Sequence, residues 1–309
     1  MIPLLPLLLA ACAPANAPAT RGPTIVSMNP CTDAILAEVA DPAQLLAISA
    51  YSQDPASSSM DLAKARSMRA VSGTVEEVAA LRPQVVVAST FEAPATAAAL
   101  KRLGFRLEQF GLAATVEDSL AQVRALARIA GHPERGEALV ARIESSLAAA
   151  RPTGAPIPAI VWQSGGIVPG QGTLITDLLN RTGFVNAAAQ RGLRQADTLP
   201  LEAMLIAPPR VILAAGNRHS EEDRLLRHPA LAALKHTRRE RLDPLLLWCG
   251  GPSIPRPVAR LAQVRRGLSP DKPLPFRGGV GVGSVVHRYA AANRQTPPPA
   301  PALKGRGSR

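Results

Sequence analysis

Apolar and polar positions follow two periods in the first third of the chain, and together they predict a sheet wound with helices. Residues 31–40 (CTDAILAEVA) carry apolar side chains at helical spacing, with Thr32 or Asp33 as the expected cap. Short apolar runs typical of strands lie at 24–28 (TIVSM), 45–49 (LLAIS) and 85–89 (VVVAS). The last is a continuous β-branched run, as in parallel strands that are buried on both faces. We therefore expect parallel strands separated by helices.

One piece of this pattern occurs twice. Residues 75–89 (VEEVAALRPQVVVAS) and 201–215 (LEAMLIAPPRVILAA) each place an acidic residue seven positions before a proline, which a branched apolar run follows. The first copy predicts a helix that stops at Arg82, because a residue before proline avoids the helical region. We interpret the repeat as an approximate duplication of a βα lobe.

Between the two copies the pattern is helical only. Residues 115–130 and 133–150 predict two helices with no strand between them, and Thr115 and Asp118 are spaced as a capping pair. The segments expected after them are a strand at 159–163, a Gly-rich loop at 164–173 (SGGIVPGQGT), a helix at 174–183 and a closing helix at 257–268.

These elements predict an α/β fold of two Rossmann-like βα lobes joined by a long connecting α-helix. The ligand cleft is expected between the lobes, where the loops at the carboxyl ends of the strands meet. The predicted segments are a signal with linker at 1–22, an N-terminal lobe at 23–112, a helical connector at 113–151, a C-terminal lobe at 152–268 and a disordered basic tail at 269–309.

The N-terminus reads MIPLLPLLLAACAPANAPAT, an apolar run too short to span a bilayer that ends in small residues and a cysteine. Its LAAC stretch resembles the lipobox of bacterial lipoproteins, in which Cys12 would be lipidated; a plain cleaved signal is the alternative. The missing basic region departs from both patterns and would fit either a true start codon further upstream or a weak signal. We expect export to the periplasm, with membrane attachment only through a lipid anchor.

The formal net charge of +12 could suggest a nucleic-acid partner, but its distribution argues otherwise. From Ser269 to Arg309 there are seven Lys or Arg and one acid, so this tail carries +6, half of the total. Aromatic residues make up 3% of the chain, without the stacking platform that single-strand binders use. We expect no nucleic-acid partner. The tail is either a basic interaction segment or a run-on of the reading frame.

No motif for catalysis or metal binding stands out. The Gly-rich loop lacks the Lys-Ser/Thr pair of a phosphate-binding loop, and Trp162 stands where a nucleophile elbow needs glycine. The five histidines fit no zinc spacing. We predict that the protein is not an enzyme and holds no cofactor and no bare metal ion.

Two cysteines remain, Cys31 and Cys249. In an oxidising compartment they could pair, and the alternative of two buried free thiols is slightly favoured.

The loops after the predicted strands carry the candidate ligand residues. Aromatic side chains offer large rigid contact areas, and amide or hydroxyl groups can bond polar ligand edges. The candidates are Asn29, Tyr51, Phe91, Gln163, Ser164 and Trp248. The aromatic ones could instead be core residues, and the Gly-rich turn simply a turn. Trp162, inside a predicted strand, is expected in the core.

The order of these pieces resembles a known family. A strand followed by NPCTDAILAEV, the two helix–Pro–strand copies around a long connecting helix, then HPALAALK and LLLWCGGP, looks like the periplasmic substrate-binding proteins of ABC importers for cobalamin and ferric siderophores. The resemblance covers residues 23–268.

This resemblance implies a function and several roles. The protein would capture a corrinoid or ferric siderophore and deliver it to an ABC permease and its ATPase, with helix 133–150 as a rigid connector. Glu76 and Glu202 would dock on the permease, although each could be a solvated residue at a helix start. The alternatives are a sensor lipoprotein of the same fold and a nitrogenase-like two-lobed metalloenzyme, for which two cysteines are too few.

Overall fold

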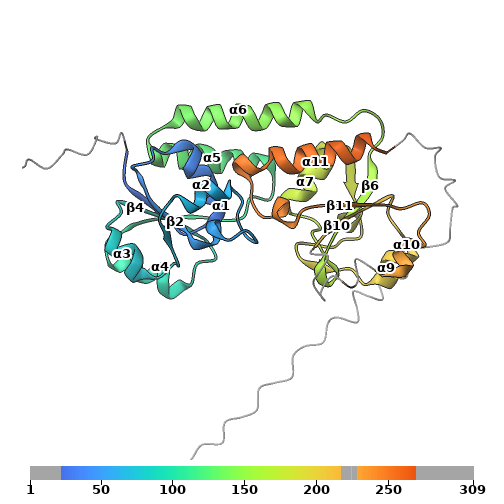
Figure 1. Ribbon diagram of the computed structural model, residues 1–309, viewed down its shortest axis with the longest axis horizontal. Helices are drawn as coiled ribbons and strands as arrows, with labels where there is room; N and C mark the ends of the chain where they lie inside the picture. Colours follow the sequence, from blue (N-terminus) through green and yellow to red (C-terminus); the bar gives the residue numbers. More distant parts are fainter. Residues whose placement is uncertain (1–21, 217–223, 225–227, 269–309) are drawn as a thin grey trace, which may run out of the picture. The chain divides into compact units, whose positions relative to one another are not determined.

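A computed structural model of the chain describes residues 22–216, 224 and 228–268 (Figure 1). All the elements described below belong to one compact unit, which ends at Gly267. The predicted signal, with Cys12, and the predicted tail at 269–309 lie outside the described residues.

The first sheet contains five parallel strands in the order β3-β2-β1-β4-β5. Its central strand, β1, pairs in register with β4, and Val26 lies opposite Val86. The strands are β1 (Ile25–Ser27), β2 (Leu45–Ser49), β3 (Ala70–Val71), β4 (Val85–Ser89) and β5 (Arg106–Phe110). The elements between them are α1 (Pro30–Val39), the 3₁₀ turn η1 (Ala50–Gln53), α2 (Leu62–Arg66), α3 (Val75–Leu81) and α4 (Pro94–Arg102).

The second sheet contains four parallel strands in the order β11-β10-β6-β8. Its strands are β6 (Ile157–Gln163), β8 (Phe184–Asn186), β10 (Val211–Ala215) and β11 (Arg238–Arg241). Its helices and turns are η2 (Ser164–Gly166), α7 (Leu174–Arg181), α8 (Ala187–Gln190), α9 (Leu201–Ile206), α10 (Pro229–Ala232), η4 (Pro244–Leu247), η5 (Gly251–Ser253) and α11 (Pro255–Arg266). The α/β class with two parallel sheets is as predicted from the sequence.

The duplicated element forms the same structure in both sheets. α3 leads into β4, which pairs with β1, and α9 leads into β10, which pairs with β6. Arg82, the residue before Pro83, leaves the helical region for the left-handed one at φ 48° and so ends α3. The repeat in the sequence therefore reports a real repeat of helix and central strand.

Two helices, α5 (Val116–Ala130) and α6 (Pro133–Ala149), separate the two sheets in the chain. The predicted capping pair forms: Thr115 accepts from the backbone of Asp118, and Asp118 accepts from the backbone of Thr115. Gly136 lets the helices approach closely, since a Cβ there would lie 2.5 Å from the Cβ of Ala127. α6 packs against α1, α5 and α11, and thus contacts elements from both sheets (Figure 1).

Two local predictions are wrong. Neither Thr32 nor Asp33 caps α1; the cap is Asn29, whose side chain accepts from the backbone N–H of Cys31 at 2.9 Å. The Gly-rich stretch is not a plain loop either, because β7 (Ile167–Val168) pairs antiparallel with β9 (Asp197–Thr198). Both differences involve partners close to the carboxyl edge of a sheet.

Candidate functional site

The start of α1 shapes the carboxyl edge of the first sheet. β1 ends at Ser27, and Asn29 caps the start of α1, because its side-chain oxygen accepts a hydrogen bond from the Cys31 N–H. The hydroxyl of Thr32 donates to the Asn29 carbonyl at 3.0 Å. The amide NH₂ of Asn29 is therefore the group that this residue can still offer to a ligand.

Asp33 holds the neighbouring loop in place from inside the fold. Its Oδ2 accepts from the Ser49 backbone N–H at 2.8 Å and from the Ser52 hydroxyl at 2.7 Å, while Oδ1 has no hydrogen-bond partner. Burial raises the pKa of Asp33 to about 7, against the lowering effect of Ser27, Ser52 and the Ser49 N–H. Asp33 thus positions η1, the turn that carries Tyr51.

Two aromatic side chains project from this edge. Tyr51 in η1 is 63% exposed and Phe91, just after β4, is 73% exposed. The Phe91 N–H donates to the Ser89 hydroxyl at 3.1 Å, which fixes its backbone at the strand end. The possibility that these two residues belong to the core is excluded.

The second sheet presents polar groups at its corresponding edge. Gln163 is the last residue of β6, opposite Ala215 at the end of β10, and it is half-buried, as is Ser164. Gly165 and Gly166 follow with φ of 71° and 81°, a conformation that suits glycine. Trp162 is fully buried in the core of this half, as predicted from its place inside the strand.

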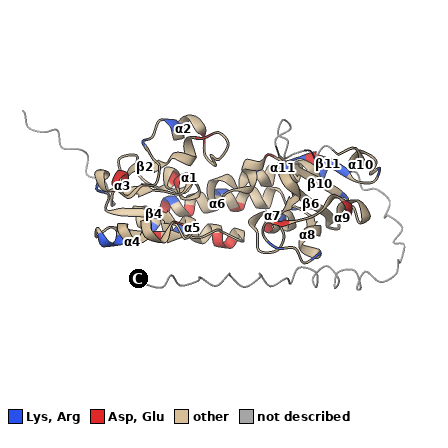
Figure 2. Cartoon of the chain, turned by 90° about the horizontal axis from the view of Figure 1, so that it is seen from below, with Lys and Arg blue, Asp and Glu red and all other residues tan. Residues whose placement is uncertain are grey.

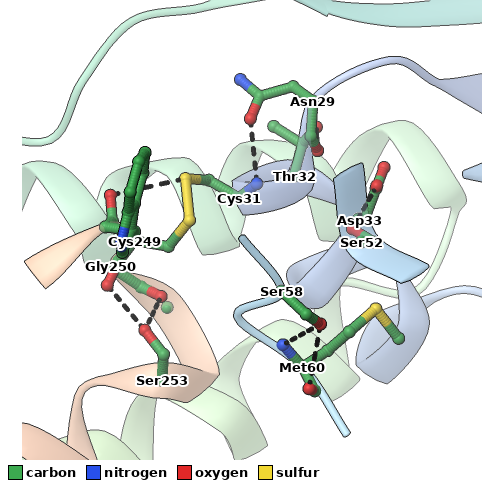
Figure 3. The surroundings of a disulfide bond; sticks show 12 residues. Asn29, Cys31, Thr32, Asp33, Ser52, Ser58, Met60, Cys249, Gly250 and Ser253 are labelled. Atoms are coloured by element: carbon green, nitrogen blue, oxygen red, sulfur yellow. Dashed lines mark hydrogen bonds between the residues drawn. A yellow bond between two sulfur atoms is a disulfide. The ribbon is translucent and has the colours of Figure 1, made fainter. Parts of the chain in front are cut away.

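A disulfide connects Cys31, at the edge of the first sheet, to Cys249, which lies in the second half of the chain (Figure 3). The favoured prediction of two free thiols is wrong. Cys31 lies in the first turn of α1 and Cys249 follows η4, so the bond joins segments 218 positions apart. It places Trp248, which is 57% exposed, next to the start of α1: the Trp248 carbonyl oxygen lies 3.7 Å from Cys31 Sγ. Because a disulfide sulfur carries no proton, this is a contact and not a hydrogen bond.

A small pocket lies beside α1. It has a volume of about 180 Å³ and is lined by residues of α1, the loop before α2, α2 itself, η5 and the start of α11. Pockets for drug-sized ligands measure about 300–1,000 Å³, so this one is too small for a chelate or a corrinoid.

The two glutamates of the repeat are exposed on their helices. Glu76 lies in the first turn of α3 and Glu202 in the first turn of α9. Figure 2 shows acidic residues in red on both helices. The adjacent Glu77 is engaged with the N–H and hydroxyl of Ser72 at 2.7 and 2.8 Å. Neither Glu76 nor Glu202 has a hydrogen bond or ion pair with another residue of the described chain. Both carboxylates are available to an external partner.

A metal site and a membrane-spanning helix each place specific requirements on the described residues. Within residues 22–216, 224 and 228–268, no group of three or more His, Cys, Asp or Glu side chains could hold a metal ion. In the same part of the chain, none of the helices has the length and apolar character needed to cross a bilayer. The assembled side chains are suited to binding: exposed aromatic rings, amides and hydroxyls.

Sequence reasoning missed two features of this site. The disulfide left no local signal, since only proximity in the fold selects Cys31 and Cys249 as a pair. The bonds of Asp33 to the η1 loop were also missed, although an acid among the apolar positions of a predicted helix was a usable signal.

Comparisons with known proteins identify the fold. Residues 25–244 match the family model described as periplasmic binding protein. None of the curated proteins matches the chain.

Solved structures share the fold at low sequence identity. The periplasmic heme-binding protein RhuT from Roseiflexus sp. RS-1, in apo form, is 23% identical with a TM-score of 0.63, over 79% of this chain and 97% of that one. A periplasmic heme-binding protein from Pseudomonas aeruginosa is 23% identical with a TM-score of 0.62, over 82% and 95%. The periplasmic vitamin B12 binding protein BtuF of Vibrio cholerae is 19% identical with a TM-score of 0.60, over 80% and 98%.

The family match spans residues 25–244, which include both sheets, and the solved structures share the fold over 79% and 80% of this chain. The chain belongs to the periplasmic binding protein family.

Proposed function

We propose that this protein is the substrate-binding component of an ABC import system and captures a metal chelate or corrinoid in a cleft between its lobes. One observation carries the proposal: Tyr51, Phe91 and Trp248 are large aromatic side chains exposed at or next to the carboxyl edge of the first sheet. Aromatic residues are only 3% of this sequence, so three at one edge form a concentrated apolar surface.

The chemistry of these groups fits a flat conjugated ligand. Aromatic faces stack on extended rings with little loss of conformational freedom. Tyrosine is also among the side chains that ligate haem iron, and Tyr51 carries its phenol on an exposed turn. The amides of Asn29 and Gln163 would bond the polar rim of such a ligand. The solved structures that share the fold include proteins named for binding heme and vitamin B12, which supports the same ligand class.

Delivery to a permease would use the two helix-start glutamates. Glu76 and Glu202 occupy equivalent places in the duplicated element and are exposed. Two separated carboxylates facing cationic side chains of a partner would set its orientation and speed its encounter. The family places the protein in the periplasm, and lipidation of Cys12 would keep it at the membrane.

The first test is a ligand titration of the full chain, monitored by tryptophan fluorescence and by calorimetry. The probes are haemin, cyanocobalamin and ferric hydroxamate and catecholate chelates. We expect a saturable one-to-one response to one of them, and a loss of affinity of about tenfold or more in Tyr51→Ala or Phe91→Ala. Leu103→Ala is the matched control, because Leu103 is 58% exposed but follows α4 at the opposite end of the sheet. Failure of every probe to bind the folded protein would contradict the proposal.

A second test separates transport from sensing. The double variant Glu76→Ala/Glu202→Ala should keep its ligand affinity and lose docking on a permease reconstituted in nanodiscs. The control is Glu77→Ala, since Glu77 lies beside Glu76 but is bonded within the chain. Undiminished docking by the double variant would contradict the role of these two glutamates, and a wild type that does not dock on the permease at all would favour the sensor alternative.

A further inference from the structure

Residues 248–253 are fastened to the first half of the chain by several independent contacts. The Cys31–Cys249 bond is the covalent one. The Gly251 N–H donates to the buried hydroxyl of Ser119 on α5 at 2.6 Å. The Ser253 hydroxyl bonds the carbonyls of Cys249 at 2.6 Å and Gly250 at 2.8 Å, which closes the turn on itself (Figure 3).

The two glycines make this close approach possible. A Cβ on Gly250 would collide with the hydroxyl of Ser119. A Cβ on Gly251 would lie 2.6 Å from the Cγ1 of Ile35 on α1, and Gly251 also has φ 61°. The Cys-Gly-Gly sequence therefore serves one packing arrangement, with the backbone pressed against α1 and α5.

Trp248 is the residue immediately before this fastened segment. Its side chain is 57% exposed, so burial does not hold it in place. The turn before it, η4, contributes no buried residue that could do so either. The position of the Trp248 ring therefore depends on the backbone of the next residue, Cys249, and on the bond that fixes it.

We propose that the Cys31–Cys249 disulfide is a positioning element of the ligand site, which holds Trp248 against the edge that carries Asn29 and Tyr51. The inference rests on the proposed function, because it assigns the disulfide a role in that same site. Loss of the bond leaves the segment held only by Ser119 and by packing, so Trp248 spends part of its time away from the edge. Apparent affinity falls in proportion to the time that the competent arrangement is populated.

The test compares the oxidised full chain with the double variant Cys31→Ser/Cys249→Ser. Serine is close in size to cysteine and cannot form the bond. Phe184→Ala is the control for lost stability: Phe184 is buried at the start of β8, at the amino end of the second sheet, away from Trp248. Haemin and cyanocobalamin are the probes, and calorimetry gives the dissociation constants.

We expect the double variant to bind the active probe about tenfold more weakly, as when the competent arrangement is populated about a tenth of the time. Phe184→Ala should bind as the wild type does at a temperature where both are folded. Equal affinity of the double variant and the wild type would overturn the inference. So would an equal loss in Phe184→Ala, since the effect would then be one of stability.

A second readout needs no ligand, so it still decides the matter if the proposed function fails. Trp162 is fully buried, and acrylamide quenching and fluorescence anisotropy therefore report mainly on Trp248. In a Trp162→Phe background, Cys31→Ser/Cys249→Ser should raise the quenching constant of Trp248 and lower its fluorescence anisotropy. Unchanged values would show that Trp248 is held without the bond, whichever ligand the protein takes.

Discussion

Replacing Asp33 by asparagine tests whether a buried carboxyl opposes folding at the ligand edge. Asp33 is wholly buried, and only its Oδ2 accepts hydrogen bonds. Asparagine has the same shape, so its amide oxygen can accept from Ser49 and Ser52 without bringing a charge into the core. We expect Asp33→Asn to fold and to be more stable than the wild type at alkaline pH.

The magnitude follows from the raised pKa of Asp33. Burial raises this pKa from 3.8 to about 7, and one pKa unit corresponds to about 1.36 kcal/mol, which gives about 4 kcal/mol. Between these two values the folded protein holds a proton that the unfolded chain has lost. The free energy of unfolding that this group contributes is therefore fully present below pH 3.8 and is lost as the pH rises to about 7. The proton is best placed on Oδ1, which has no partner.

Urea unfolding at pH 5 and pH 8 measures this effect. The free energy of unfolding of Asp33→Asn, minus that of the oxidised wild type, should rise by about 3 kcal/mol from pH 5 to pH 8. Asp41→Asn is the control: a hydrogen bond from Arg135 lowers the pKa of Asp41 from 3.8, so the stability from that carboxylate is lost only on acidification below this value. The difference between Asp41→Asn and the wild type should therefore be the same at pH 5 and pH 8. A difference for Asp33→Asn that is independent of pH, or larger at pH 5, would refute the reasoning.

Three further changes test the packing around the site. Cys31→Ser/Cys249→Ser should lower the free energy of unfolding by up to about 5 kcal/mol, which is the chain-entropy value for a separation of 218 residues. Urea unfolding of the wild type in the presence of reductant should give the same loss of stability. Gly251→Ala should cost about 1–3 kcal/mol more in thermal unfolding than Gly165→Ala, because both have positive φ but nothing lies within 4 Å of a Cβ on Gly165; equal losses would show that only backbone strain matters. Gly136→Ala should lower the melting temperature through its clash with Ala127, and Ala127→Gly in the same chain should restore part of it; a gain in Gly136→Ala alone would contradict this.

The parts of the fold that could be predicted from sequence are those encoded by neighbouring residues. The two copies of helix, proline and strand became α3–β4 and α9–β10. Both signals are local, because a residue before proline ends a helix and a run of branched apolar residues favours a buried strand. The capping pair at the start of α5 is local too. The short strands β3 and β9 depend instead on which strand lies beside them, and two residues carry no pattern that could announce this.

The candidate site divides in the same way. Tyr51 and Phe91 could be placed at a sheet edge because each follows a recognisable strand. The sequence did not determine whether their side chains are exposed or buried. Gln163 and Ser164 follow β6 for the same reason. Trp248 follows no such strand directly, and its place at the edge of the first sheet comes from a bond to the other half of the chain.

Residues that act across the fold explain why the site lies where it does. Thr32 or Asp33 was expected to cap α1, but Asn29 takes that role, which leaves the Asp33 carboxyl group to bind the η1 loop from inside. Cys31 lies on the same helix two residues earlier and bonds the chain 218 positions further on. One turn of α1 thus fixes both loops that carry the aromatic residues Tyr51 and Trp248. Damage to this turn should therefore impair ligand binding at both places, even where the overall fold survives.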